Sequence, residues 1–367
     1  MKKIALLVLF LTTLSFGLSA QNGITYTDAQ KLRHIGKLSV TTNPYHRAEV
    51  ADYPQMNSSE SKLLCYSAGQ AICFETDAKE IWVQADYGKY SSPIAMPATA
   101  SHGYTLYIEK DGEWIWASSR ANRAKKNDDG TENLDKPLRV IGGMNNEPKR
   151  CMLYLPLFAE VSNVRIGVPE GSLMRPIKAP FRHRIAMFGS SFTHGDGATA
   201  AGMTLPAYLS RETGLNFCSY GMAGNSKLQD FMGDILGKTK ADAYVCDAFS
   251  NPTINEIGSR IDDFILAVRK HNPKAPIIFI RTIYRERRNF EVDTDSREAL
   301  RMEYVDKLMA KICQKYPDVY YIDKQGQTGD DHHTSTDGTH PFSWGYYRWA
   351  KSIEQPILDI LAKYKIK

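Results

Sequence analysis

The sequence has 367 residues, six cysteines and a formal net charge of +5. This length is generous for one domain and sufficient for two. The nearly balanced charge gives no reason to expect nucleic-acid binding, and so few cysteines in so long a chain exclude a small disulfide-stabilised scaffold.

The first twenty residues have the pattern of an export signal. Lys2 and Lys3 precede an apolar run over residues 4–11, and the small residue Ala20 suits a cleavage site directly after it. The apolar run is too short for a membrane anchor. We therefore expect a secreted or periplasmic mature protein that begins after residues 1–20, has a net charge of +3 and lacks a membrane span.

The cysteines do not form a metal-binding pattern. No CxxC or Cys/His spacing indicates zinc, so we expect no metal site and no cofactor. Cys218 and Cys246 lie in or beside apolar runs and are expected to be buried. Cys65 and Cys73 either pair across adjacent strands in an oxidising compartment or remain unpaired in the core.

Residues 24–178 are rich in short β-type segments. A hairpin is indicated where residues 103–109 run into Lys110-Asp-Gly and residues 113–117 follow. Without helical periodicity, this spacing predicts an antiparallel β-sandwich. The polar stretch 120–136 is expected to be a surface loop. The other predicted strands are 71–76, 80–85, 150–155 and 164–168.

Residues 182–367 change character, because apolar strand-like runs alternate with helical stretches. Five such alternations predict a five-stranded parallel sheet covered by helices, which is an α/β fold. Pro356 is expected to kink the last helix. The predicted strands are 184–188, 216–220, 243–247, 276–281 and 319–322, and the predicted helices are 204–213, 227–236, 255–270, 296–316 and 344–363.

In sheets of this kind ligands bind beyond the carboxyl ends of the strands. The loops there contain a serine, a glycine, an asparagine and an Asp-x-x-His segment. A serine hydroxyl is a weak nucleophile until a base takes its proton, and His340 is a candidate base for Ser191. Asp337 lies three residues earlier, where it can orient the imidazole and stabilise the imidazolium.

Attack on an ester carbonyl creates an oxyanion, which needs hydrogen-bond donors placed in advance. The backbone N–H of Ser191, the backbone N–H of Gly224 and the side-chain amide of Asn251 are the candidate donors. Glycine suits this role because it lets the backbone approach closely.

These residues resemble the motifs of the GDSL/SGNH hydrolases, whose four blocks supply Ser, Gly, Asn and His in this order. Gly189-Ser190-Ser191 stands where the family has Gly-Asp-Ser, and Asp337-Gly-Thr-His340 stands in the Asp-x-x-His block. The resemblance covers about 180–360 and implies a flavodoxin-like, three-layer α/β/α SGNH domain over residues 182–367.

The upstream half is also similar to a family feature. Ser67-Ala-Gly, Phe74-Glu-Thr-Asp and Gly103-Tyr-Thr-Leu-Tyr resemble the β domain that precedes some bacterial members, which implies a jelly-roll-like sandwich. Three residues depart from the family pattern: Ser190 and Pro252 replace aspartates, and Thr105 replaces an acidic residue. These three departures leave the triad intact, but they weaken any inference of a specific substrate from the family.

Other polar groups near the predicted loops have simpler interpretations. Asp330, Asp331, His332 and His333 suggest a metal site, but adjacent residues rarely point at one ion, so a solvated loop is favoured. His194 is expected to be polar loop filler, with pocket lining as the alternative. Arg285, Arg287 and Arg288 form a basic loop that is solvated by default and contacts an anionic or sugar substrate in the alternative interpretation.

Competing motifs fail. A P-loop would need Gly-Lys-Ser/Thr in the glycine-containing loop after the first strand of this half, where no lysine stands, and Gly195-Asp-Gly197 is not continued as G-x-G-x-x-G. The nucleophile elbow G-x-S-x-G fails because residue 193 is threonine, which excludes the ordinary α/β-hydrolase pattern.

The sequence therefore predicts a serine esterase that works through an acyl-enzyme and has no cofactor. Export, the β-sandwich and the family together suggest removal of short acyl groups, above all O-acetyl groups, from carbohydrate. The alternatives are a lipase or thioesterase of the same superfamily, an inactive carbohydrate-binding protein, and an acetyltransferase that uses the same triad.

Overall fold

The structure is a computed structural model that describes residues 20–21, 23–123 and 134–367. Most of the predicted export signal and most of the predicted surface loop 120–136 lie outside the described residues. The two residues that flank the predicted cleavage point form β1 (Ala20–Gln21), which pairs antiparallel with β2 (Ile24–Asp28). In the described part of the chain, no helix is long and apolar enough to cross a membrane.

The N-terminal part consists of two sheets in which every paired neighbour is antiparallel. The first has the order β1-β2-β10-β5-β8, and the second β11-β4-β9-β6-β7 with β3 paired to β4. Apolar side chains of both sheets, such as Phe74, Val83 and Ile166, share one buried cluster. The antiparallel, β-rich N-terminal part is confirmed. The bounds are β3 Arg33–Ile35, β4 Ala71–Thr76, β5 Glu80–Tyr90, β6 Tyr104–Lys110, β7 Glu113–Arg120, β8 Leu138–Gly142, β9 Lys149–Tyr154, β10 Ala159–Pro169 and β11 Arg175–Pro176.

This part also contains a helix that the strand pattern does not predict, α1 (Ser58–Cys65). Asn57 accepts hydrogen bonds from the backbone N–H groups of Ser59 and Glu60, and the Glu60 side chain returns to the Asn57 N–H. This capping box starts the helix without a long apolar run. The shorter helical segments are η1 Ala29–Lys31, η2 Val50–Asp52 and α2 Ala98–Ser101.

The C-terminal part contains a five-stranded, wholly parallel sheet of order β13-β12-β14-β15-β16. This is the flavodoxin-like order, with the first strand of the domain between the second and the third. The predicted parallel sheet is confirmed. Its strands are β12 Arg182–Gly189, β13 Leu215–Gly221, β14 Ala243–Asp247, β15 Ile277–Ile280 and β16 Val319–Ile322.

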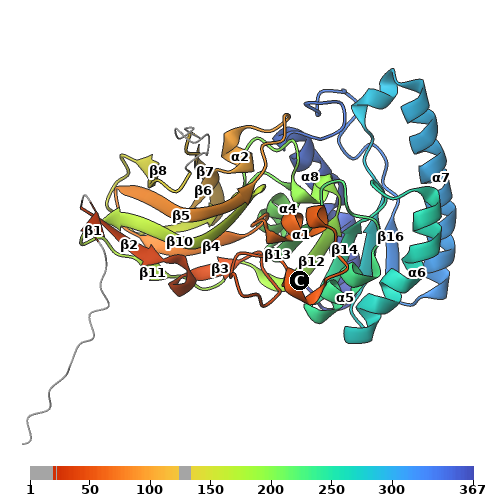
Figure 1. Cartoon of the computed structure of the whole chain (residues 1–367), viewed down its shortest axis with the longest axis horizontal. Helices are drawn as coiled ribbons and strands as arrows, with labels where there is room; N and C mark the ends of the chain where they lie inside the picture. Colours follow the sequence, from red (N-terminus) through yellow and green to blue (C-terminus); the bar gives the residue numbers. More distant parts are fainter. Residues whose placement is uncertain (1–19, 22, 124–133) are drawn as a thin grey trace, which may run out of the picture.

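Helices flank this sheet, in the part of the molecule opposite the two antiparallel sheets (Figure 1). α4 contacts α8, and α5 contacts α6, which in turn contacts α7. Pro356 lies inside α8, which continues from Ser343 to Ala362. The bounds are α3 Ser191–His194, α4 Leu205–Thr213, α5 Asp230–Lys238, α6 Ile254–His271, η3 Glu286–Asn289, α7 Val292–Lys315 and α8 Ser343–Ala362.

The two parts share a hydrophobic core. One buried cluster joins N-terminal side chains such as Tyr66 and Phe158 to Phe188 and Phe192 around the start of the parallel sheet. Because this cluster packs directly behind the loop after β12, the N-terminal part supports the region where the candidate site lies.

All six cysteines are free thiols. Cys218 and Cys246 are buried, as predicted. Cys65 ends α1 and Cys73 lies in β4, so the structure has the unpaired form of these two residues rather than the disulfide.

Candidate active site

The loop after β12 turns sharply into α3. Gly189 must lack a side chain, because a Cβ there would lie 2.1 Å from Thr193 Oγ1. Ser190 caps α3, and its Oγ accepts a hydrogen bond from the Phe192 N–H at 3.2 Å. Ser191 is the first residue of α3 and is 8% exposed. The turn therefore presents the Ser191 hydroxyl at the carboxyl edge of the sheet.

A chain of hydrogen bonds joins Ser191, His340 and Asp337. Ser191 Oγ lies 2.9 Å from His340 Nε2, and His340 Nδ1 lies 2.8 Å from Asp337 Oδ2. Neutral imidazole donates from one nitrogen and accepts at the other. With Nδ1 donating to the carboxylate, Nε2 is free to accept the serine proton.

Asp337 is fixed by its own backbone. Its Oδ1 accepts the N–H groups of Thr339 at 2.8 Å and His340 at 2.7 Å, while Oδ2 faces the imidazole. Burial alone would raise the pKa of this carboxyl, but the hydrogen bonds from His340 and from the two backbone N–H groups outweigh it and hold the pKa below its ordinary value. Asp337 therefore stays ionised at neutral pH.

The imidazole has two further neighbours that sequence reasoning missed as site residues. Phe192 packs edge-on against the His340 ring with centroids 5.6 Å apart. Asp196 Oδ2 lies 3.8 Å from His340 Nε2, and the Tyr346 hydroxyl donates to the Asp196 carbonyl at 2.6 Å. Burial raises the pKa of Asp196, although His340 opposes the shift. The available signal was an acid five residues after Ser191 in a glycine-rich loop.

The three candidate oxyanion donors lie on the loops after β12, β13 and β14. Gly224 has φ +71°, a conformation that favours glycine, and a Cβ there would meet no atom within 4 Å. The left-handed backbone conformation therefore favours glycine at this position. Asn251 Oδ1 accepts the Ser226 N–H at 3.3 Å, and among the described residues its Nδ2 has no partner.

Ser190, which replaces the family aspartate, contacts a carboxylate from another strand. Asp247, at the end of β14, accepts hydrogen bonds at Oδ2 from Ser190 Oγ at 2.7 Å, Ser190 N at 3.2 Å and Thr193 Oγ1 at 3.3 Å. Burial raises the pKa of Asp247 to about 6, partly opposed by these bonds. A buried carboxylate thus supports the nucleophile turn from below, in a place the sequence motif did not indicate.

The expectation that the arginines of this loop are solvated is wrong for Arg285, which is buried. Its guanidinium pairs with Glu298 at 2.5 Å, and together with Arg301 it donates to the Ser250 carbonyl, at 3.2 and 2.8 Å. This carbonyl directly precedes Asn251. The loop was expected to be exposed because three arginines occur in a short segment, but Glu298 on α7 compensates the charge of Arg285.

The other two arginines also have protein partners. The Arg288 guanidinium pairs with Asp295 at 2.8 Å. The backbone N–H of Arg287 donates to the carbonyl of Gly338, which lies between Asp337 and His340 in the sequence. The suggested metal group at 330–333 does not converge either, because Asp331 pairs with Arg348 and His332 with Glu286, each at 2.7 Å.

His194 is neither exposed filler nor a pocket residue. It is buried, with Nε2 2.7 Å from the Leu157 carbonyl and Nδ1 3.0 Å from the Gly221 carbonyl, and it stacks on Phe158 at 4.2 Å. Burial and the nearby Arg47 lower its pKa to about 3, so the ring is neutral at neutral pH. Both expectations for His194 failed because its partners lie in distant parts of the sequence.

The flavodoxin-like sheet, with a hydrogen-bonded Ser–His–Asp chain on the loops at its carboxyl edge, has the SGNH α/β fold. The sequence model of the GDSL-like lipase/acylhydrolase family matches residues 182–358, and a model for the N-terminus of SGNH-hydrolase-type esterases matches residues 24–174. The chain belongs to the GDSL-like lipase/acylhydrolase family, as the sequence motifs predicted.

Solved structures agree with this assignment. A protein of Bacteroides ovatus described as a GDSL-like lipase is 32% identical, with a TM-score of 0.86 over 92% of this chain and 98% of that one. A salicylyl-acyltransferase from a tetracycline biosynthetic pathway is 18% identical (TM-score 0.67, 93% and 99% covered), and a family two carbohydrate esterase of Clostridium thermocellum is 14% identical (TM-score 0.56, 80% and 93% covered). The last two show the fold alone. No curated protein matches the chain.

Proposed function

We propose that the protein is a serine esterase that removes acetyl groups from carbohydrate. The observation that carries the proposal is the continuous hydrogen-bonded chain from Ser191 Oγ through His340 to Asp337. His340 takes the proton of Ser191 as the hydroxyl attacks the ester carbonyl, and then returns a proton to the leaving alcohol. Water activated by His340 hydrolyses the acyl-enzyme.

In this mechanism three donors stabilise the oxyanion. The first donor is the backbone N–H of Ser191, the first residue of α3, and the second is the N–H of Gly224, which has a left-handed conformation. The third is the Nδ2 group of Asn251, which is available because only Oδ1 of this side chain bonds to Ser226. The chemistry needs only side-chain and backbone groups of this chain.

The carbohydrate part of the substrate is proposed from the surroundings of Asn251. A cavity of about 440 Å³ opens there; five of its seven lining residues are polar or charged, although apolar atoms make up most of its surface. Amide, hydroxyl and guanidinium groups suit the hydroxyls of a sugar better than a long acyl chain. The family two carbohydrate esterase has the same fold, which is consistent with a carbohydrate substrate. The lining residues are Asn251, Pro252, Thr253, Ile254, Asn255, Arg297 and Arg301.

A chain-length series and a polysaccharide panel test this function. With 4-nitrophenyl acetate, butyrate and octanoate, kcat/KM should be highest for acetate, and acetate should be released from at least one acetylated plant polysaccharide but not by Ser191→Ala. A preference for octanoate would favour the lipase alternative. Acetyl transfer to added sugar in place of hydrolysis would favour the acetyltransferase.

We also propose that the protein is exported. The support is the basic and apolar pattern of residues 1–20. When the full chain is expressed in a Gram-negative host, the periplasmic or secreted protein should begin at Gln21. Retention of the full-length chain in the cytoplasm would contradict export.

A further inference from the structure

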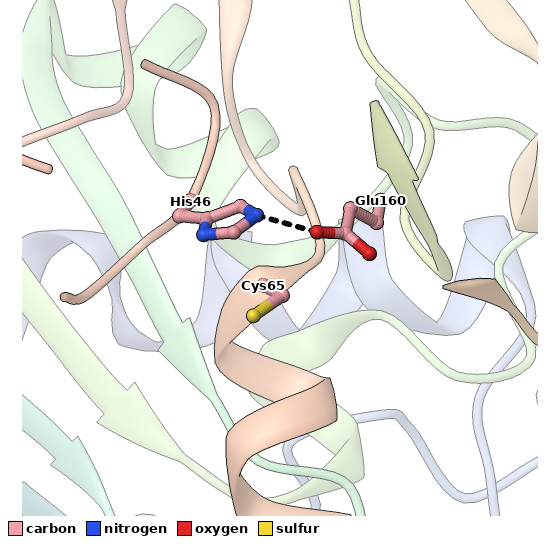
Figure 2. A group of neighbouring side chains, drawn as sticks. All are labelled: His46, Cys65 and Glu160. Carbon is pink, nitrogen blue, oxygen red and sulfur yellow. Dashed lines mark hydrogen bonds and ion pairs between the residues drawn. The ribbon is translucent and has the colours of Figure 1, made fainter. Parts of the chain in front are cut away.

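Three metal-ligating side chains from distant parts of the sequence converge where the loop before η2, α1 and β10 meet. His46 lies in the loop before η2, Cys65 ends α1, and Glu160 is the second residue of β10 (Figure 2). One ligand atom from each lies within 4.8 Å of the others, and all three residues are partly buried. Among the described residues this is the one such group of His, Cys and carboxylate side chains.

We propose that His46, Cys65 and Glu160 bind one zinc ion, with a water molecule as the fourth ligand. A thiolate, an imidazole and a carboxylate together favour zinc over the hard cations magnesium and calcium, which prefer oxygen ligands. The thiolate and the carboxylate carry two negative charges that match a divalent cation. The spacing 46, 65 and 160 has no motif, so the sequence pattern predicts no metal here.

The nitrogen ligand, His46, and the oxygen ligand, Glu160, are already in contact. His46 Nε2 lies 2.7 Å from Glu160 Oε1, and Glu160 Oε2 accepts the Lys89 N–H at 3.2 Å. Lys37 also binds the His46 carbonyl, which fixes the loop. Such outer contacts orient the ligands of metal sites.

The third ligand is free to turn toward the ion. The Cys151 and Cys218 thiols donate to carbonyls two residues earlier, at 3.8 and 3.5 Å, whereas Cys65 Sγ has no hydrogen-bond partner in the described part of the chain. Because zinc holds nitrogen and sulfur at about 2.0–2.3 Å, the His46–Glu160 contact must open slightly and Sγ must move inward by roughly 1 Å. A side-chain rotation at the last residue of a helix supplies this movement.

Zinc binding releases one proton, that of the Cys65 thiol. The Cys65 thiol loses its proton to solvent as the sulfur–zinc bond forms. The proton that His46 Nε2 shares with Glu160 moves to Nδ1 by exchange with solvent, so that Nε2 coordinates as neutral imidazole, and no redox partner is required. Arg47 and Lys89 interact electrostatically with Cys65 and add positive charge nearby. We therefore expect weaker binding than at a four-ligand structural site.

The bound ion would connect α1, the 43–46 loop and β10 without contacting the triad. Glu160 follows Phe158, which stacks on His194, so the ion would strengthen the contact between the two parts of the molecule. Zinc is therefore expected to raise the temperature of unfolding and to leave ester hydrolysis unchanged.

Cobalt reports on this site directly. Co²⁺ added to chelator-treated full-length protein should give the near-ultraviolet thiolate-to-metal band at one equivalent, and zinc should remove it. Cys65→Ser should abolish the band, and His46→Gln or Glu160→Gln should weaken Co²⁺ binding at least about tenfold. Cys313→Ser is the matched control, since Cys313 is the other partly buried free thiol, and should keep the band.

Alkylation of the unmodified chain gives an independent test that needs no variant to fold. Zinc should slow iodoacetamide labelling of Cys65 at least about tenfold, measured by peptide mass spectrometry, and leave Cys313 labelling unchanged. Equal labelling of Cys65 with and without zinc, or a cobalt band that persists in Cys65→Ser, would overturn the proposal.

Discussion

At the scale of single residues, the candidate site depends on how each polar group is held. Asp337 uses one carboxylate oxygen for two backbone N–H groups and the other for His340 Nδ1. This division fixes both the orientation and the tautomer of the imidazole. The catalytic contribution of Asp337 is therefore expected to come from charge and geometry together.

Asp337→Asn should lower kcat by about 10³–10⁴-fold, because an amide at Oδ2 would present a donor to Nδ1 and favour the wrong tautomer. The measurement is steady-state hydrolysis of 4-nitrophenyl acetate, with a circular dichroism spectrum to show that the variant is folded. A folded variant with kcat within tenfold of the parent would mean that Asp337 does not orient the base.

Asp247 leads to a prediction about the pH dependence of stability. Its pKa is raised to about 6 by burial, so the folded state retains a proton that the unfolded state loses near pH 4. The contribution of Asp247 to stability therefore falls as pH rises from about 4 to 6, and the penalty remains above that. Arg285 opposes the shift, as do the hydrogen bonds from Ser190 and Thr193.

Asp247→Asn should remove this dependence. Urea unfolding at pH 4.5 and at pH 7.5 should show that the free energy of unfolding of the variant minus that of the parent is larger at the higher pH, which means that the variant is relatively more stable there. The same difference at both pH values would show that Asp247 titrates normally in the folded protein.

At the scale of elements, the loop after β14 is held from behind by α7. Arg301, on α7, donates to the carbonyls of Ser250 and Pro252 at 2.8 and 3.3 Å, on both sides of Asn251. Glu298 accepts from the same guanidinium. The oxyanion donor proposed on this loop is thus positioned by a buried ion pair rather than by the loop alone.

Arg301→Met should lower kcat about tenfold with KM within twofold, because Asn251 loses its support but is still present. Asn251→Ala should cost more, about 10²-fold. Arg297→Met is the control: Arg297 lines the same cavity, but its side chain donates to Thr294 Oγ1 within α7. An equal loss of kcat in the Arg297 variant would point to a general effect on the cavity.

Sequence patterns predicted the strands and helices of the C-terminal part well, because each strand is a short apolar run and each long helix has apolar residues at helical spacing. Residues 243–247 are β14 as predicted. α1 was missed because a capping box, and not a hydrophobic run, starts it. Ser191, Asp337 and His340 were predictable from local motifs. Asp247, Arg301 and His194 each also bind a residue 27 or more positions away, and no local pattern reveals these contacts.

At the scale of the whole molecule, the N-terminal part is built into the hydrolase part. Arg47, in the N-terminal part, is fully buried and donates to the Tyr66 carbonyl at 3.0 Å and to the Gly221 carbonyl of the hydrolase part at 2.8 Å. Conversely, His194 of the hydrolase part contacts the Leu157 carbonyl of the N-terminal part. Because the two parts share a hydrophobic core, we expect them to unfold together.

The full chain is therefore expected to unfold in one calorimetric transition, with calorimetric and van't Hoff enthalpies in agreement. A fragment of residues 182–367 should expose the apolar residues that face Tyr66 and Phe158 and should aggregate or lose activity. Two separable transitions in the full chain, or a soluble and fully active fragment, would contradict a shared core.

The central claim is that Ser191 is the residue that is acylated. A fluorophosphonate reacts covalently with an activated serine, so labelling followed by peptide mass spectrometry identifies the nucleophile directly. We predict one label per chain on the peptide that contains Ser191, loss of 4-nitrophenyl acetate hydrolysis in proportion to labelling, and no label in Ser191→Ala. Label on a different serine, or full hydrolytic activity in Ser191→Ala, would contradict the claim.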